Sequence, residues 1–407
     1  NIENLDAIVV THAHLDHCGL VPLLFKYGYD GPVYASEPTI PLMALLQMDY
    51  INVVEKNGAQ PPYSYSEIKE ELLHAIPLKY GMVSDIAPDI KLTLYNAGHI
   101  LGSSIVHLHI TEGVHNIVFT GDFKYGRTLL LNPAYSDIAR AETLVIESTY
   151  GDPGDIMPDR EAVERNFIEL VNSTLKARGK VLIPTPAAGR AQEIMIVIDK
   201  YMRAGLLAEV PVFIEGLINE ASYIHMSYPT YLSREVSAGM IEGSRNPFTS
   251  EYFTVITNAG QRDEVVSGGP CIIIATSGMM EGGPVIDYFA RLADDERNAL
   301  VFVSYQVPGT LGNRLLSGLR QVNIVQEGKL TTINVRLKVA SVEGFSGHSD
   351  RKQLLRYVAK LRPKVRNVIV THGEPTKVNA LAHSITRIFK LNTLAPSILE
   401  TTTLVPG

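Results

Sequence analysis

Cysteines and long apolar runs are scarce in this chain of 407 residues. Its two cysteines, Cys18 and Cys271, are too few for a disulfide framework, which favours a reducing, cytoplasmic location. No uninterrupted apolar run approaches the ~20 residues that a bilayer-spanning helix requires. The sequence therefore excludes a disulfide-stapled secreted scaffold, and we expect no membrane partner.

The chain also has no excess of basic residues, and its formal net charge is −7. That charge is unfavourable for a protein that binds nucleic acid, but metal ions and a few arginines can dominate the local field of a site. Tyrosine and phenylalanine are scattered, without the stacking array that marks single-strand binding platforms. The remaining composition, 45% hydrophobic and 19% charged, is that of an ordinary globular protein long enough for two domains.

The chain begins with Asn1-Ile2-Glu3-Asn4 in place of an initiator methionine. An apolar stretch at 7–10 follows at once and predicts a buried strand. We therefore expect sequence upstream of Asn1 to be missing, including the first strands of the fold.

Strand-like and helix-like segments alternate clearly from about residue 140 onward. Including two earlier apolar stretches, strands are expected at 7–10, 116–120, 144–146, 181–183, 210–214, 271–275, 300–303, 329–339 and 367–371. Helices are expected at 159–178, 190–204, 349–361 and 377–389. Such alternation predicts an α/β fold with a parallel, doubly wound sheet.

The densest group of polar residues is His12-Ala13-His14-Leu15-Asp16-His17, directly after the apolar stretch at 7–10. Open α/β folds place their sites at the carboxyl ends of strands. Imidazole nitrogens together with a carboxylate suit zinc. A solvated polar loop is the alternative, but the density of the group favours a metal site.

Three further segments place a histidine or an aspartate among glycines after an apolar strand. They contain His99, Asp122 and His372. The tripeptide Val10-Thr11-His12 is also repeated as Val370-Thr371-His372, which suggests that the two ends of the chain contribute to one site. Taken alone each segment is a weak signal, but together they supply five histidines and two aspartates. That set suffices for two metals that share one bridging carboxylate, an arrangement used for phosphoester hydrolysis.

These residues resemble the metallo-β-lactamase signature, in which His-x-His-x-Asp-His is followed by a distant His, an Asp and a final His. The resemblance implies an αββα sandwich and two zinc positions. One zinc would be held by His12, His14 and His99. The other would be held by Asp16, His17 and His372, and Asp122 would bridge the two.

Three motifs resemble those of the β-CASP nucleases within this superfamily. They are Glu147 in Ile146-Glu147-Ser148-Thr149-Tyr150-Gly151, His348 in Gly344-Phe345-Ser346-Gly347-His348-Ser349-Asp350, and His372 in Thr371-His372-Gly373-Glu374-Pro375. Segments at 189–193, 277–284 and 305–310 are typical of the same group. The whole chain is most similar to the archaeal homologues of the nuclease subunit of the cleavage and polyadenylation specificity factor. The resemblance implies a metallo-β-lactamase domain in two parts, 1–157 and 339–407, with an inserted β-CASP domain at 158–338.

The resemblance further implies a zinc-dependent ribonuclease that hydrolyses RNA phosphodiester bonds between the two domains. It would act in RNA 3′-end processing, transcription termination or RNA decay. Its expected catalytic residues are His348 as proton donor, Asp16, and Glu147, which would orient either a ligand histidine or His348. We expect two zinc ions per chain with manganese as the alternative, single-stranded RNA as the partner, and a homodimer. Many archaeal members of the family carry RNA-binding KH domains ahead of the nuclease, which this sequence neither shows nor excludes. Three alternatives stay open: a 5′-to-3′ exoribonuclease of the RNase J type, an inactive scaffold paralogue, and a lactonase-like hydrolase of small molecules.

Four residues of the insert are candidates for contact with RNA: Arg190, Ser277, Gly278 and Arg314. Arg190 opens a predicted helix, where backbone N–H groups favour an anion. For these residues a solvated arginine or a plain turn is the competing interpretation. Lys124 and Arg127 would likewise either line an RNA path or be ordinary surface charges. Cys18 beside His17 would be either a stray ligand or a small buried side chain.

Overall fold

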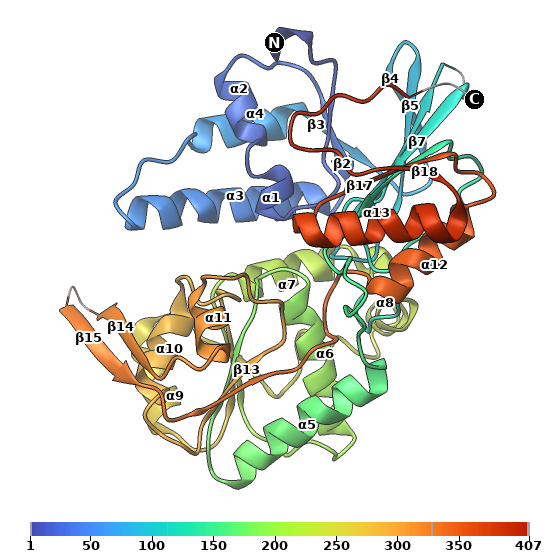
Figure 1. The fold of residues 1–407 in the computed structure, drawn as a ribbon. Helices are drawn as coiled ribbons and strands as arrows, with labels where there is room; N and C mark the ends of the chain where they lie inside the picture. The colour runs from blue at the N-terminus through green and yellow to red at the C-terminus, as the bar shows by residue number, and fades with distance from the viewer. Residues whose placement is uncertain (1, 112, 327–328, 405–407) are drawn as a thin grey trace. The chain divides into compact units, whose positions relative to one another are not determined.

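The computed structural model describes residues 2–111, 113–326 and 329–404 (Figure 1). The chain divides into two compact units, one formed by Asn1–Ile156 with Gly347–Gly407 and the other by Met157–Ser346. The second unit is therefore a single insertion into the first.

The first unit contains two sheets. One sheet is parallel, in the order β1 (Ile8–Val9), β2 (Val33–Ser36) and β3 (Ala75–Leu78). The other has the order β18 (Asn392–Leu394), β17 (Asn367–Thr371), β8 (Thr143–Glu147), β7 (His115–Phe119), β6 (Ser104–Ile110), β5 (Ile90–Asn96) and β4 (Val83–Ala87). Strands β4 to β7 of this sheet are antiparallel, and β7, β8, β17 and β18 run parallel.

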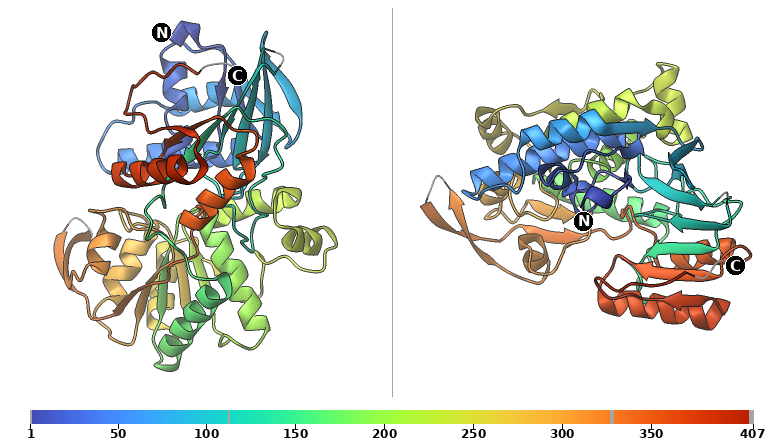
Figure 2. Two further views of the ribbon diagram at one scale, coloured as in Figure 1. Left: turned by 45° about the vertical axis from the view of Figure 1, so that its right-hand side comes forward. Right: turned by 90° about the horizontal axis from the view of Figure 1, so that it is seen from above.

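Side chains that alternate along the strands give the larger sheet two apolar faces. Val106 on β6 packs with Tyr34 and Leu78 of the smaller sheet. Its neighbour Ile105 points the other way, into a core shared with α12 (Arg351–Leu361) and α13 (Pro375–Phe389), which lie on one side of that sheet (Figure 2).

Helices also cover the smaller sheet. Strand β2 is buried along its whole length and contacts α3 (Thr39–Lys56). The remaining helices of this unit are α1 (Leu15–Cys18), α2 (Val21–Lys26) and α4 (Tyr65–His74). The layers therefore run helix, sheet, sheet, helix, and the predicted αββα sandwich is confirmed.

The second unit is built on a parallel sheet of six strands. Their order is β11 (Phe253–Val255), β10 (Val212–Glu215), β12 (Ile272–Ala275), β9 (Val181–Pro184), β13 (Ala299–Phe302) and β16 (Lys338–Ser341). The unbroken apolar runs of the inner strands reflect burial on both faces, as a doubly wound α/β fold requires. The helices are α5 (Arg160–Lys176), α6 (Arg190–Arg203), α7 (Ile218–Ser227), α8 (Arg234–Ile241), α9 (Ala259–Ser267), α10 (Pro284–Leu292) and α11 (Leu311–Leu316).

The prediction of a single strand over 329–339 is wrong. Its first half is β15 (Lys329–Asn334), which forms an antiparallel hairpin with β14 (Gln321–Gln326), and its second half enters β16. Val335 and Leu337, between the two strands, are both buried in the core of the second unit. Alternation continues across the break, so the pattern alone could not reveal a change of partner. The other predicted strands and helices begin and end within two residues of their expected positions.

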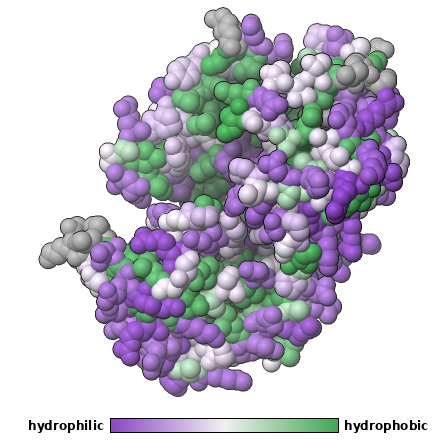
Figure 3. All heavy atoms as spheres, viewed as in Figure 1, coloured by the Kyte–Doolittle hydropathy of each residue, from purple (hydrophilic) through white to green (hydrophobic). Residues whose placement is uncertain are grey.

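Hydrophilic and hydrophobic side chains are intermixed on the face drawn in Figure 3. Among the residues that the structure describes, no helix combines the length and apolarity needed to cross a membrane.

Candidate metal centre

Five of the seven expected ligands lie in loops of the first unit that follow strands, and the other two, Asp16 and His17, lie in the short helix α1. His12 and His14 come after β1, His99 lies in the turn between β5 and β6, Asp122 follows β7, and His372 follows β17. Strands β7 and β17 run parallel on either side of β8, so their carboxyl ends meet at one edge of the sheet. The fold thus brings together side chains that are up to 360 positions apart in the sequence.

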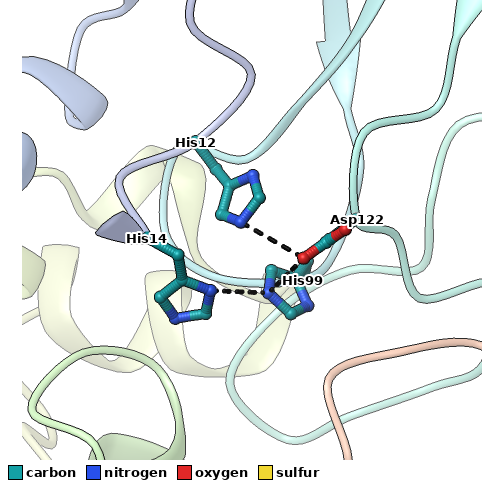
Figure 4. A group of neighbouring side chains, drawn as sticks. All are labelled: His12, His14, His99 and Asp122. Carbon is teal, nitrogen blue, oxygen red and sulfur yellow. Dashed lines mark hydrogen bonds and ion pairs between the residues drawn. The ribbon is translucent and has the colours of Figure 1, made fainter. Parts of the chain in front are cut away.

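One group of ligand atoms comprises His12, His14, His99 and Asp122, all within 4.8 Å of one another. Figure 4 shows these side chains pointing toward a common centre. The Nε2 atoms of His12 and His99 lie 3.4 and 3.7 Å from Asp122 Oδ2, and His99 Nε2 lies 3.1 Å from His14 Nδ1. The second nitrogen of His99 bonds the carbonyl of Gly347 at 2.9 Å, which directs Nε2 into the centre.

A second group comprises Asp16, His17, His372 and the same Asp122, again within 4.8 Å. His17 Nε2 lies 3.3 Å from Asp122 Oδ2, whereas His372 Nε2 lies 3.2 Å from Asp122 Oδ1. His372 adopts a left-handed backbone, with φ of 50°, directly after β17. Residues with such a backbone conformation cluster at functional sites, where strain helps to aim a side chain.

The donor atoms fit a metal. Nε2 of His12, Nε2 of His17 and Oδ1 of Asp122 are buried and make no hydrogen bond, although imidazole or carboxylate atoms lie 3.2 to 3.4 Å away. Buried polar atoms in proteins nearly always have a partner. Cations at the two positions would satisfy these three atoms between them, and imidazole with carboxylate is a donor set that suits zinc.

Burial keeps the histidines of the first group neutral, which is the form that binds metal. It lowers the pKa of His14 to about 3 and the pKa of His99 well below its ordinary value. The positions formed by these histidines are therefore ready to coordinate a cation across the physiological pH range.

The carboxylates have the opposite effect in the second group. Burial favours the neutral form of Asp122, but the imidazoles of His12 and His17 beside it outweigh burial and hold the pKa of Asp122 below its usual range. Burial also opposes the charge of His17, yet the neighbouring carboxylates of Asp122 and Asp16 raise the pKa of His17 to about 10. A metal entering this position must therefore displace a proton from His17.

Glu147 and His348 form a hydrogen-bonded pair beside this centre. Glu147, the last residue of β8, is 2% exposed, and its Oε1 and Oε2 lie 3.0 and 2.9 Å from Nδ1 of His348. Burial opposes protonation of His348, but the Glu147 carboxylate outweighs it and raises the pKa of His348. Of the two partners considered for Glu147, the structure gives it His348. The pair also lies within 4.8 Å of an oxygen of Asp122.

Lys124 is not the ordinary surface charge that one of the two interpretations of its sequence position expected, and its role toward RNA stays a prediction. It is 4% exposed, and its ammonium group donates to the carbonyl of His348 at 2.7 Å. Ser349 donates to the carbonyl of Phe123 at 3.0 Å and accepts from the N–H of Tyr125 at 2.9 Å. These bonds fasten the segment that carries His348 to the segment that carries Asp122. The only sequence signal was the closeness of Lys124 to Asp122.

Ser277 and Gly278, two of the candidates for RNA contact, lie in a turn whose polar groups form hydrogen bonds with residues of the same unit. The Ser277 hydroxyl donates to the carbonyl of Gly282 and accepts from the N–H of Glu281, both at 3.1 Å. The carbonyl of Gly278 accepts from the side chain of Gln306 at 3.0 Å. The turn is thus tied to its own unit, and a role of these residues toward RNA stays a prediction.

The two candidate arginines lie on different helices of the second unit. Arg190 is the first residue of α6 and is half-buried, and Arg314 is exposed on α11. Their role toward RNA also stays a prediction.

The chain matches three protein families along its length. Residues 1–148 match the metallo-beta-lactamase superfamily domain, residues 191–315 the Beta-Casp domain, and residues 332–396 the Zn-dependent metallo-hydrolase RNA specificity domain. The last description names a zinc-dependent hydrolase and a specificity for RNA, so the family evidence supports metal binding.

Several curated archaeal proteins are similar to nearly the whole chain. Transcription termination factor FttA of Cenarchaeum symbiosum is 52% identical over 98% of this chain and 62% of its own length. The proteins of the same name from Pyrococcus horikoshii and a Lokiarchaeum species are 51% and 47% identical, with 98% of this chain and 61% and 63% of theirs covered. The chain therefore spans about three fifths of the length of these relatives. Together with the three family matches, this similarity establishes that the chain belongs to the β-CASP family of the metallo-β-lactamase superfamily, in its archaeal branch related to the cleavage and polyadenylation specificity factor.

Proposed function

We propose that this chain is a zinc-dependent ribonuclease that hydrolyses phosphodiester bonds of single-stranded RNA. The observation that carries the proposal is the Asp122 carboxylate, which belongs to two groups of metal-ligating side chains and borders the Glu147–His348 pair. Two metal positions that share a carboxylate are suited to in-line displacement at phosphorus. The match to an RNA specificity domain supports RNA as the substrate.

The reaction adds a water oxygen to phosphorus, breaks the bond to the 3′ oxygen and transfers a proton to that leaving oxygen. Two bound zinc ions would supply hydroxide at neutral pH and offset the charge on the phosphate oxygens. His348 supplies the proton from Nε2, because Glu147 holds its Nδ1 and favours its charged form. The products are a 5′-phosphate and a 3′-hydroxyl end.

The name of the relatives supports a role of this cleavage in transcription termination. We propose that the protein acts in the cytoplasm on nascent transcripts, with two zinc ions per chain and manganese as the alternative metal. A homodimer and a substrate path between the two domains stay predictions.

The test is cleavage of one RNA labelled either internally or at its 5′ end. Metal-loaded protein should produce shorter fragments from both substrates, and Asp122→Ala should produce none. His383→Ala, which changes an exposed histidine of α13, is the matched control and should cut at the wild-type rate. Release of single nucleotides from the 5′ end would identify the exonuclease alternative. Intact RNA with wild-type protein, or normal cleavage by Asp122→Ala, would contradict the proposal.

A further inference from the structure

The turn that carries Asp16 and His17 has little structure of its own. Helix α1 is a single turn of four residues, and its N-cap residue, His14, makes no side-chain capping bond. Isolated helices of this length are unstable, and the last carbonyls of a helix have no partner within it. Something outside α1 must therefore set its orientation.

Packing of the ligand side chains cannot by itself set the orientation of α1. The Asp16 side chain is 63% exposed, and that of His17 is 18% exposed. Cys18, which follows them, is buried, and its thiol donates to the carbonyl of Ala13 at 3.1 Å. Cys18 is thus a buried side chain that folds the loop onto itself, as one of the two interpretations of its position expected.

Gln47 provides the external anchor. Its side-chain amide, 0% exposed on α3, donates to the carbonyl of Cys18 at 3.0 Å and to Oε1 of Glu71 at 3.2 Å. Glu71 lies on α4 and is also 0% exposed. Helices α1 and α4 both contact α3 (Figure 1), and Gln47 belongs to α3. Burying two polar side chains between helices has a desolvation cost, whereas apolar side chains would pack the same helices without that cost. Their distinctive effect is to direct an amide donor at the last carbonyl of α1.

We propose that Gln47, held by Glu71, is a positioning residue for the metal position formed by Asp16, His17, Asp122 and His372. The inference rests on the proposed two-metal function. The Gln47 anchor should affect only one of the two metal positions, because the other position takes no ligand from within α1. His12 and His14 precede the helix, and His99 is held by the carbonyl of Gly347. Loss of the Gln47 anchor should weaken one metal position and spare the other.

The test is a titration of the metal-free full chain with Zn²⁺ against a competing chelator, repeated with Co²⁺ and its absorption bands. Wild-type protein should bind two equivalents. Gln47→Met preserves the length of the side chain but removes its donor, and should bind one of the two equivalents about 10- to 100-fold more weakly while the other is unchanged. Glu71→Gln keeps an acceptor oxygen beside Gln47 and should bind both equivalents like wild type. Glu71→Met, which removes that acceptor, should show a smaller loss confined to the same equivalent.

Ile51→Val is the matched control, because Ile51 lies on the same helix, is 1% exposed and packs between α3 and α4. It should lower stability by trimming the same helical core without changing either metal affinity. Equal weakening of both equivalents in Gln47→Met, or unchanged affinities in both Gln47→Met and Glu71→Met, would overturn the inference. Wild-type protein that binds only one equivalent would overturn the two-metal proposal and this inference with it.

Discussion

Replacing Glu71 with glutamine should change how the stability of the protein depends on pH. Glu71 is 0% exposed, and burial raises its pKa to about 8 from a value of 4.5. The folded protein therefore keeps this carboxyl protonated between about pH 5 and pH 8, whereas the unfolded chain releases the proton. A carboxyl whose pKa is raised on folding destabilises the folded state as the pH rises.

The size of the effect follows from linkage. Each pH unit between the two pKa values costs about 1.4 kcal/mol of folding free energy. From pH 5 to pH 8 the wild-type protein should lose about 3–4 kcal/mol through this one group, and the loss should level off above the folded-state pKa. In Glu71→Gln the group cannot ionise, so this contribution to the pH dependence disappears.

The assay is denaturant-induced unfolding of both proteins at pH 5, 6, 7, 8 and 9, with a chelator present so that metal binding does not contribute. The difference in unfolding free energy should grow with pH in favour of Glu71→Gln, because the titration of every other group is common to both proteins. Glu70→Gln removes an exposed carboxylate one position earlier on the same helix, and its difference from wild type should stay flat. Parallel stability profiles for wild type and Glu71→Gln would refute the assignment of a neutral, buried Glu71.

Three further predictions concern the centre and the second unit. His348→Ala should keep both metals and still bind RNA but cut it about 10²–10⁴-fold more slowly. His372→Ala should instead lose one metal. Equal metal loss in the two variants would show that His348 is a ligand. Lys124→Met, which removes the donor to the His348 carbonyl, should slow single-turnover cleavage roughly 10- to 100-fold at unchanged metal content, and a wild-type rate would show that this bond does not position His348. Gly278→Ala should lower the free energy of unfolding by about 1–3 kcal/mol in thermal melts, because a Cβ there would lie 2.7 Å from Cδ of Pro186. Gly269→Ala, where a Cβ meets nothing within 4 Å, is its control, and equal melting temperatures of the two variants would contradict the packing argument.

The sequence predicted which side chains the fold brings together at the candidate metal centre, because their signal is local. His12 to His17 form one dense motif, and His99, Asp122 and His372 each follow an apolar strand whose end the pattern marks. The alternating strands and helices of the second unit could also be predicted, because buried parallel strands are continuous apolar runs.

What the sequence could not predict depends on tertiary contacts. Gln47 and Glu71 are polar residues within amphipathic helices, and nothing in their spacing shows that they are buried. The role of Lys124 depends on the carbonyl of His348, more than 200 positions away. The break of the 329–339 stretch depends on which strands pair, and alternation does not encode pairing partners.

The central claim is that two metal ions on one chain make it a ribonuclease. Its most direct test is the initial rate of cleavage of a labelled single-stranded RNA by metal-free protein to which Zn²⁺ is returned in measured equivalents. The rate should be negligible without metal, stay low through the first equivalent, and rise to its plateau as the second equivalent binds. Cleavage at the plateau rate with one equivalent or none, or no cleavage with two equivalents bound, would contradict the claim.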